Sequence, residues 1–264
     1  HLSTAQAARY HAFPYLHEEM GAALAAANLA VSRAGASALG LVGPMPSGPG
    51  IIADDMIFEI ARHVPPPIGT FLLTSETTAA TTLPLPTEMG GVSVLINGRP
   101  APLLFVSPGQ INLQVPWETG AGAANFSVLF GGLPSNTITA PVRTAAPGIF
   151  VTVRADGSLV TAERPAAASD VLIIYATGLG AVDQPVITGG PAPGNPVAGV
   201  TNNVTVRFGN VAATEVFFAG LTPGFVGLYQ INVRVPTGVP VGATTPLTVS
   251  AAGQTSAPSP LPTR

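Results

Sequence analysis

Residues 90–122 read GGVSVLINGRPAPLLFVSPGQINLQVPWETGAG, and residues 202–242 repeat the same order of features. Each copy begins with a Val-Ser-Val or Val-Thr-Val run, passes a turn that contains glycine and reaches a second apolar run. Each copy then ends on Gln-Ile-Asn-x-x-Val-Pro, at residues 110–116 and again at residues 230–236. Because both copies keep one order of strands and turns, the repeat predicts two similar β-domains.

The stretches around the two copies have the same character. Short runs of Val, Ile, Leu and Thr recur about every 8–12 residues between Gly, Pro and Asn turns, which is typical of a β-sandwich. The pair Asn97-Gly98 suits the positive φ angles of a type I′ hairpin turn. We therefore expect a mainly β chain with two tandem immunoglobulin-like sandwiches, the first over residues 69–147 and the second over residues 148–264.

Residues 1–68 differ from the rest and hold all four histidines of the chain. Loosely helical spacing over residues 4–34, and a capped pattern in DDMIFEIARHV, predict a short helix-rich α/β segment. The run GTFLLTS at residues 69–75 stands where DVLIIY, at residues 170–175, stands before the second copy. It is therefore expected to be the opening strand of the first sandwich.

Composition excludes several classes of function. Apolar residues make up 47% of the chain and charged residues 9%, so the chain is too apolar and too weakly charged for disorder. The basic residues are ten dispersed arginines with no lysine, which predicts no nucleic-acid partner. No apolar run reaches the roughly 18–20 residues that a spanning helix needs, so no membrane insertion is expected. The absence of cysteine excludes disulfides and thiolate metal sites.

Two segments of the sequence also resemble known protein families. VSVLINGRPAPLLFVSPGQINLQVPWE, APGIF at residues 146–150, DVLIIYATGLG and FAGLTPGFVGLYQINVRVP resemble, in order, the Solibacter C-terminal domain over residues 80–260. This is an uncharacterised β-rich family of secreted acidobacterial proteins, related to IPT/TIG-type immunoglobulin-like folds. The resemblance implies an extracellular or cell-envelope location and an accessory role, and it supplies no catalytic or ligand-binding residue.

Residues 30–78, which include ALGLVGPMPSGPGIIADDMIFEIARHV, are similar to an early β–α–β piece of phosphoribosylanthranilate isomerase. That family uses a cysteine base, and this chain has no cysteine. About one and a half of the eight βα units of such a barrel are present. The resemblance therefore carries no isomerase residue into this chain.

The polar residues offer few candidates for catalysis or metal binding. An amino-terminal His1 suggests a copper brace, but the predicted sandwiches contain no second histidine. His11 and His17 are six residues apart, which places them on different sides of a helix, unlike the HExxH spacing. No GxSxG elbow is present. We therefore expect no enzyme, no metal site and no cofactor.

Ligand binding leaves more candidates open. Gln110 and Gln230, with an asparagine two residues after each, form either polar binding ridges or hydrogen bonds that fix the neighbouring loops. The second alternative is favoured because both copies keep the pair beside the same turn. Trp117 and Tyr229 are candidates for stacking on a sugar. Tyr229 also falls in a strand pattern, which favours a place in the core over stacking on a sugar. The same holds for five phenylalanines: Phe105, Phe126, Phe130, Phe217 and Phe218.

The predicted function is that of a non-enzymatic structural or interaction module at the surface of a bacterial cell. Its partner would be a protein or a polysaccharide. One alternative is a carbohydrate-binding accessory module, favoured if Trp117, Tyr175 or Tyr229 is exposed on a flat face. The other is an inactive remnant of an isomerase-like barrel joined to a β-module.

Overall fold

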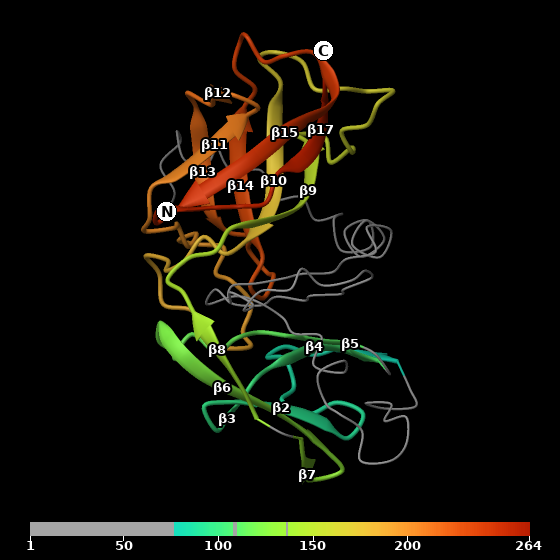
Figure 1. Cartoon of the computed structure of the whole chain (residues 1–264), viewed down its shortest axis with the longest axis vertical. Coiled ribbons are helices and arrows are strands. Elements are labelled where there is room, and N and C mark those ends of the chain that lie inside the picture. Colours follow the sequence, from blue (N-terminus) through green and yellow to red (C-terminus); the bar gives the residue numbers. More distant parts are fainter. Residues whose placement is uncertain (1–76, 108–109, 136) are drawn as a thin grey trace.

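The computed structural model describes residues 77–107, 110–135 and 137–264. In this part of the chain all seventeen regular elements are β-strands, so the prediction of a mainly β fold is confirmed. The expected helix-rich segment at residues 1–68 and the expected strand at residues 69–75 lie outside the described residues. Two lobes are stacked along the long axis of the molecule (Figure 1).

The first lobe contains two antiparallel sheets. Sheet A has the order β1–β4–β5, and sheet B has the order β3–β2–β6–β7, with β8 also paired to β6. Their strands are β1 (Thr78–Ala79), β2 (Val92–Ile96), β3 (Arg99–Pro100), β4 (Leu103–Ser107), β5 (Gln110–Leu113), β6 (Gly122–Phe130), β7 (Leu133–Pro134) and β8 (Ile138–Val142).

The second lobe also contains two antiparallel sheets. Sheet C has the order β13–β14–β10–β9, and sheet D has the order β12–β11–β15–β16, with β17 also paired to β15. Their strands are β9 (Gly148–Arg154), β10 (Val171–Thr177), β11 (Val204–Phe208), β12 (Val211–Ala212), β13 (Val216–Leu221), β14 (Tyr229–Arg234), β15 (Gly242–Ala251), β16 (Gln254–Thr255) and β17 (Ser259–Thr263).

The pairing in sheets B and D agrees residue by residue. Ile96 faces Phe126 across β2 and β6, and Phe208 faces Leu247 across β11 and β15. The hairpins that follow β6 and β15 close with the same side-chain bond. The amide of Val128 donates to Ser135 Oγ at 3.0 Å, and the amide of Val249 donates to Ser256 Oγ at 3.1 Å.

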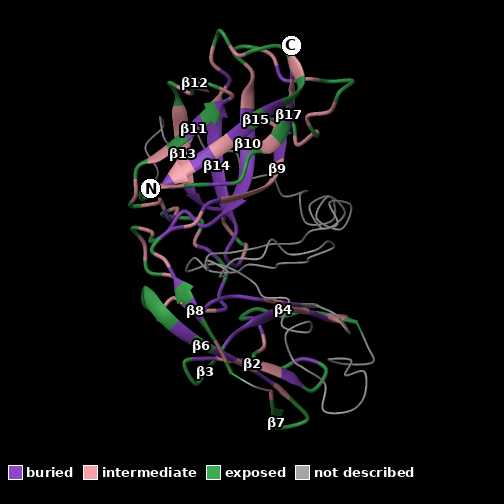
Figure 2. Cartoon of the chain, in the orientation of Figure 1, coloured by how far each residue is buried: buried purple, intermediate pink, exposed green. Residues whose placement is uncertain are grey.

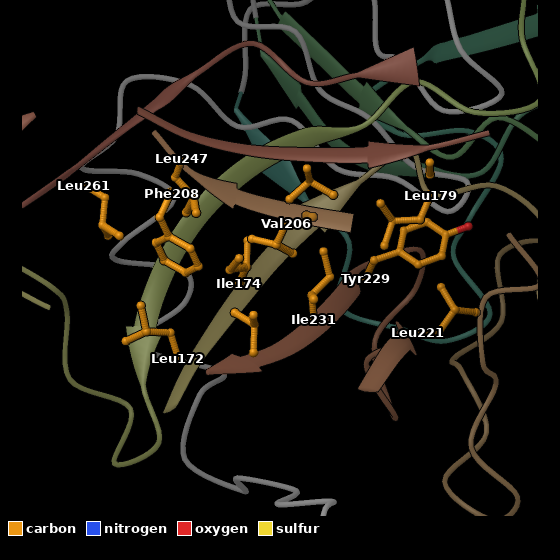
Figure 3. Close-up of a cluster of buried hydrophobic side chains, with 14 of the residues drawn as sticks. Leu172, Ile174, Leu179, Val206, Phe208, Leu221, Tyr229, Ile231, Leu247 and Leu261 are labelled. Atoms are coloured by element: carbon orange, nitrogen blue, oxygen red, sulfur yellow. The ribbon is translucent and has the colours of Figure 1, made fainter. Parts of the chain in front are cut away.

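Each lobe has its own core between its two sheets. In the first lobe the inward residues of sheet B pack against the inward residues of sheet A, and burial alternates along β2, β6 and β8 (Figure 2). The second core is larger and is built around Ile174, Phe208, Tyr229 and Ile231 (Figure 3). Alternation of buried and exposed residues is what strands with one face on a core require.

Candidate functional site at the sandwich junction

The linker between the lobes, residues 143–147, is held along its length. Ala145 is fully buried and belongs to the core of the second lobe. The Ala146 amide donates to the Gly178 carbonyl at 2.9 Å. Gly178 has a φ of +79°, and a Cβ at this position would lie 1.7 Å from the Ala146 carbonyl oxygen. Only glycine therefore allows the linker to lie so close to the turn after β10.

A second contact comes from residues 186–190, which we call the clasp. The clasp belongs to the connection between β10 and β11, and it reaches back to the first lobe. The Leu85 amide donates to the Gly189 carbonyl at 2.8 Å, and the Gly189 amide donates to Gln114 Oε1. Gln114 is fully buried. A buried amide side chain needs hydrogen-bond partners, so this contact ties a residue of the first lobe to the clasp.

The position of Gly189 in the clasp requires a residue without a side chain. Its φ is +77°, and a Cβ there would lie 3.2 Å from Pro102 Cγ and 3.5 Å from the Leu85 nitrogen. Both the backbone conformation and the space thus favour glycine. The clasp backbone lies against the first lobe because no side chain separates them.

Trp117, the single tryptophan, is a residue of the first lobe that contacts the second lobe. Its indole packs against the core of the second lobe. Its backbone amide donates to Thr188 Oγ1 at 3.1 Å, and the Thr188 hydroxyl donates to Glu118 Oε2 at 2.9 Å. The Arg143 guanidinium also bonds across the junction, to Gln254 Oε1 at 2.5 Å. The junction therefore combines apolar packing with direct hydrogen bonds.

The three aromatic candidates from the sequence, Trp117, Tyr175 and Tyr229, lie in different places. Tyr229 is fully buried in the second core, where its hydroxyl donates to the Gly180 carbonyl. Tyr175 is also buried, beside Ile173 and Leu228 on the outer side of sheet C. Trp117 is half-buried, with its ring turned to the second lobe. The structure thus does not gather these rings on one exposed face, and ligand binding at Trp117 stays a prediction.

The Gln-Ile-Asn pair of the second copy lies inside the protein. Gln230 Nε2 donates to Asn232 Oδ1 at 2.8 Å, and both residues are buried. Burial of both side chains argues against an exposed binding ridge at this copy. The observed bond joins the two side chains to each other, so the expected bonds to a neighbouring loop stay a prediction. In the first copy, Asn112 is half-buried opposite Phe105, just as Asn232 lies opposite Phe218.

Residues that hold metals are not grouped in the described part of the chain. No three His, Cys, Asp or Glu side chains there are close enough to share an ion. Among these residues no helix is long and apolar enough to cross a membrane. The four histidines, which the metal hypotheses required, stand at positions outside the described residues.

The main charge cluster supports the second lobe rather than the junction. Arg154 donates to Asp170 Oδ2 at 2.6 Å and to the carbonyls of Arg164 and Pro165 at 2.7 and 2.8 Å. Burial raises the pKa of Asp170, but the Ala167 amide and the Arg154 guanidinium outweigh it and hold that pKa below its ordinary value. The carboxylate thus fastens β9, β10 and the segment between them.

Replacing Asp170 by Asn should therefore cost stability in a pH-dependent way. A carboxylate whose pKa is lowered on folding stabilises the folded state above its unfolded pKa of about 4, and this contribution is lost as the pH falls through the lower folded value. The difference in unfolding free energy between the native chain and Asp170→Asn should be larger at pH 7 than below pH 4, as urea titrations would measure. An equal difference at both pH values would contradict the assignment.

Comparisons with known proteins give only weak structural likenesses. No protein-family model and no curated protein matches the chain. Among solved structures, it is similar to SGBP-B of the mixed-linkage glucan utilization locus of Bacteroides ovatus, in complex with a mixed-linkage heptasaccharide. That match has 15% identity, a TM-score of 0.27, and covers 86% of this chain and 46% of the other.

A second similar structure is the C-terminal domain of the AgI/II polypeptide BspA of Streptococcus agalactiae. It has 12% identity and a TM-score of 0.17, with 58% of this chain and 64% of that chain covered. The chain thus spans less than two thirds of both structures. Likeness at this level carries no argument about what the chain binds.

Proposed function

We propose that residues 77–264 form a non-catalytic structural and interaction module of a secreted or cell-surface protein, in which two duplicated immunoglobulin-like sandwiches act as one rigid unit. The observation that carries this proposal is the clasp, where the Gly189 backbone bonds to both Leu85 and Gln114. The module would hold whatever precedes and follows it at a fixed distance and angle.

Rigidity is not the default for two joined domains. Interfaces between domains of one chain are commonly polar enough to allow relative motion. Here the linker residue Ala145 is buried in the second core, and Trp117 of the first lobe packs on that same core. Two independent crossings, the linker and the clasp, then oppose both bending and twisting.

Replacing Gly189 by Ala should loosen the junction without unfolding either sandwich. The new Cβ would press on Pro102 and on the Leu85 amide, at a φ that disfavours alanine. Spin labels can be placed at Leu133→Cys and Val241→Cys, because both positions are exposed and the chain has no cysteine. Pulsed electron–electron double resonance on the full chain should give a narrow distribution of distances between the two labels. Gly189→Ala should broaden this distribution.

Gly157→Ala is the matched control for that measurement. Gly157 has a similar φ of +82°, with nothing within 4 Å of an added Cβ. It should leave the distance distribution unchanged. A distribution that is already broad in the native chain would mean that the lobes move freely. A narrow distribution that Gly189→Ala does not alter would mean that the clasp does not hold them together. Either result would overturn the proposal.

A carbohydrate-binding role is the competing function. The mixed-linkage heptasaccharide held by SGBP-B is a suitable probe, and the single Trp117 gives a fluorescence signal for titration. Because Tyr175 and Tyr229 are buried, they offer no ring face for sugar stacking. Saturable binding of that oligosaccharide by the full chain would favour the carbohydrate-binding alternative.

A further inference from the structure

The two sandwiches place the same hairpin in different surroundings. The hairpin β6–β7 of the first lobe pairs Phe130 with Leu133, and the hairpin β15–β16 of the second lobe pairs Ala251 with Gln254. Both hairpins close with the same bond from a strand amide to a serine hydroxyl. Phe130 and Leu133 are therefore the counterparts of Ala251 and Gln254.

In the second lobe this hairpin lies at the junction. Arg143 directly follows β8, the last strand of the first lobe, and its guanidinium bonds to Gln254 Oε1. Ala251 is buried and belongs to the second core. The hairpin of the second lobe thus contacts the segment where the first lobe ends.

The hairpin of the first lobe lies at the far end of that lobe, away from the second lobe (Figure 1). Here Phe130 is 41% exposed and Leu133 is 77% exposed. As cross-strand neighbours, the two side chains lie on one face of the hairpin. We call residues 130–133 the hairpin end. Two neighbouring exposed apolar side chains, at the place of an established contact, point to an interaction surface.

The opposite end of the molecule repeats the other half of the junction. In the first lobe Ala121 comes directly before Gly122, which pairs with the end of β8. In the second lobe Val241 comes directly before Gly242, which pairs with the end of β17. The end of β17 lies beside the C-terminus, at the end of the molecule farthest from the first lobe (Figure 1).

Residues 237–241, which we call the exit loop, are the counterpart of residues 117–121. Both segments directly follow the repeated Gln-Ile-Asn-x-x-Val-Pro. Residues 117–121 begin with Trp117, which packs on the second lobe. In the exit loop Val241 is 78% exposed. In the described part of the chain, Val241 and Leu133 are the two most exposed large apolar residues, and they stand at opposite ends.

We propose that these two ends bind each other in different copies of this chain, so that the hairpin end of one copy packs on the exit loop of the next. The internal junction is the template for this contact, because it joins the counterparts of the same two elements within one chain. The bond between Arg143 and Gln254 does not carry over, since Leu133 stands in place of Gln254. Burial of Phe130, Leu133 and Val241 replaces it.

Charge and shape favour a second copy as the partner. Neither residues 130–133 nor residues 237–241 include a charged residue, so the two ends meet without like-charge repulsion. The ends are different surfaces, so the contact is head-to-tail and can repeat from copy to copy. It depends on the ends of the molecule rather than on a rigid junction, and it thus goes beyond the proposed function.

Sedimentation of the full chain tests this association. The contact is small, so self-association is expected to be weak, with the mean mass rising as the protein concentration approaches about 1 mM. Leu133→Gln, which copies the second lobe, should weaken the association about tenfold, because it removes one buried apolar side chain. Val241→Gln should have a similar effect.

Leu83→Gln is the matched control. Leu83 is also an exposed leucine, but it lies two residues before Leu85, which bonds to the clasp, and so it is remote from both ends. It should leave the association unchanged. A native chain that stays monomeric up to about 1 mM would overturn the proposal, as would an equal effect of all three substitutions.

Single cysteines show which ends meet, because the chain has none of its own. An equal mixture of Leu133→Cys and Val241→Cys chains, mildly oxidised at high concentration, should form more mixed disulfide than the half that random pairing gives. Mass spectrometry of the linked peptides measures the three products. A random ratio would contradict a specific contact, and an excess of either self-pair would mean that like ends meet; both results overturn the head-to-tail proposal.

Discussion

Replacing Gly178 by Ala should lower the free energy of unfolding of the second sandwich by more than about 4 kcal/mol, which is exceptional for one methyl group. The added Cβ would overlap the Ala146 carbonyl oxygen at 1.7 Å and the Pro147 nitrogen at 2.7 Å. Both contacts are backbone, so no side chain can turn aside. Urea denaturation followed by circular dichroism should show the loss.

Gly224→Ala is a control with the same backbone conformation. Gly224 has the same φ of +79°, with nothing within 4 Å of an added Cβ. It should cost only the left-handed penalty of about 1–2 kcal/mol. Similar losses in the two variants would mean that conformational strain alone, rather than the close approach of the linker, explains the need for Gly178.

Local patterns predicted the strands well. The type I′ turn expected at Asn97-Gly98 is present, with φ angles of 51° and 78°. The second apolar run of each copy is a strand, β4 from Leu103 in the first copy and β13 from Val216 in the second. These features depend on alternation and on turn residues within a few positions. A sequence states such short-range information directly.

The aromatic residues show where pattern alone is insufficient. Phe126 and Tyr229 are buried as expected, but Phe130 is 41% exposed. Phe130 is the last residue of β6, where the strand runs past the core into a Gly-Gly turn. Alternation predicts which face a residue takes, but it does not predict where along the strand the opposite sheet ends.

The junction could not be predicted from the sequence. Gly178 and Gly189 look like ordinary turn residues, and Gln114 looks like one more polar position in a strand. Their roles depend on contacts between residues about 30 to 100 positions apart, and no local period encodes such contacts. The glycine pairs TGLG and TGG were the available signal, since two closely spaced glycines can mark close backbone approach.

The Phe208–Leu247 pair of the second core should tolerate exchange better than truncation. Phe208→Ala would leave a cavity beside a fully buried neighbour and should cost about 3–5 kcal/mol. In the equivalent pair of the first core the aromatic ring lies on the other strand, because Phe126 of β6 faces Ile96 of β2. Phe208→Leu combined with Leu247→Phe copies that arrangement, so it should cost less than about 1.5 kcal/mol.

Urea unfolding followed by the fluorescence of Trp117 measures this directly, because its indole packs on the same core. Phe126→Ala provides the matched truncation in the first lobe, with an expected loss of similar size. If the exchanged pair is as unstable as Phe208→Ala, the two cores do not share one packing solution despite their common register. If it is close to the native chain, the interior of the second lobe accepts the geometry of the first, as two copies of one sandwich should.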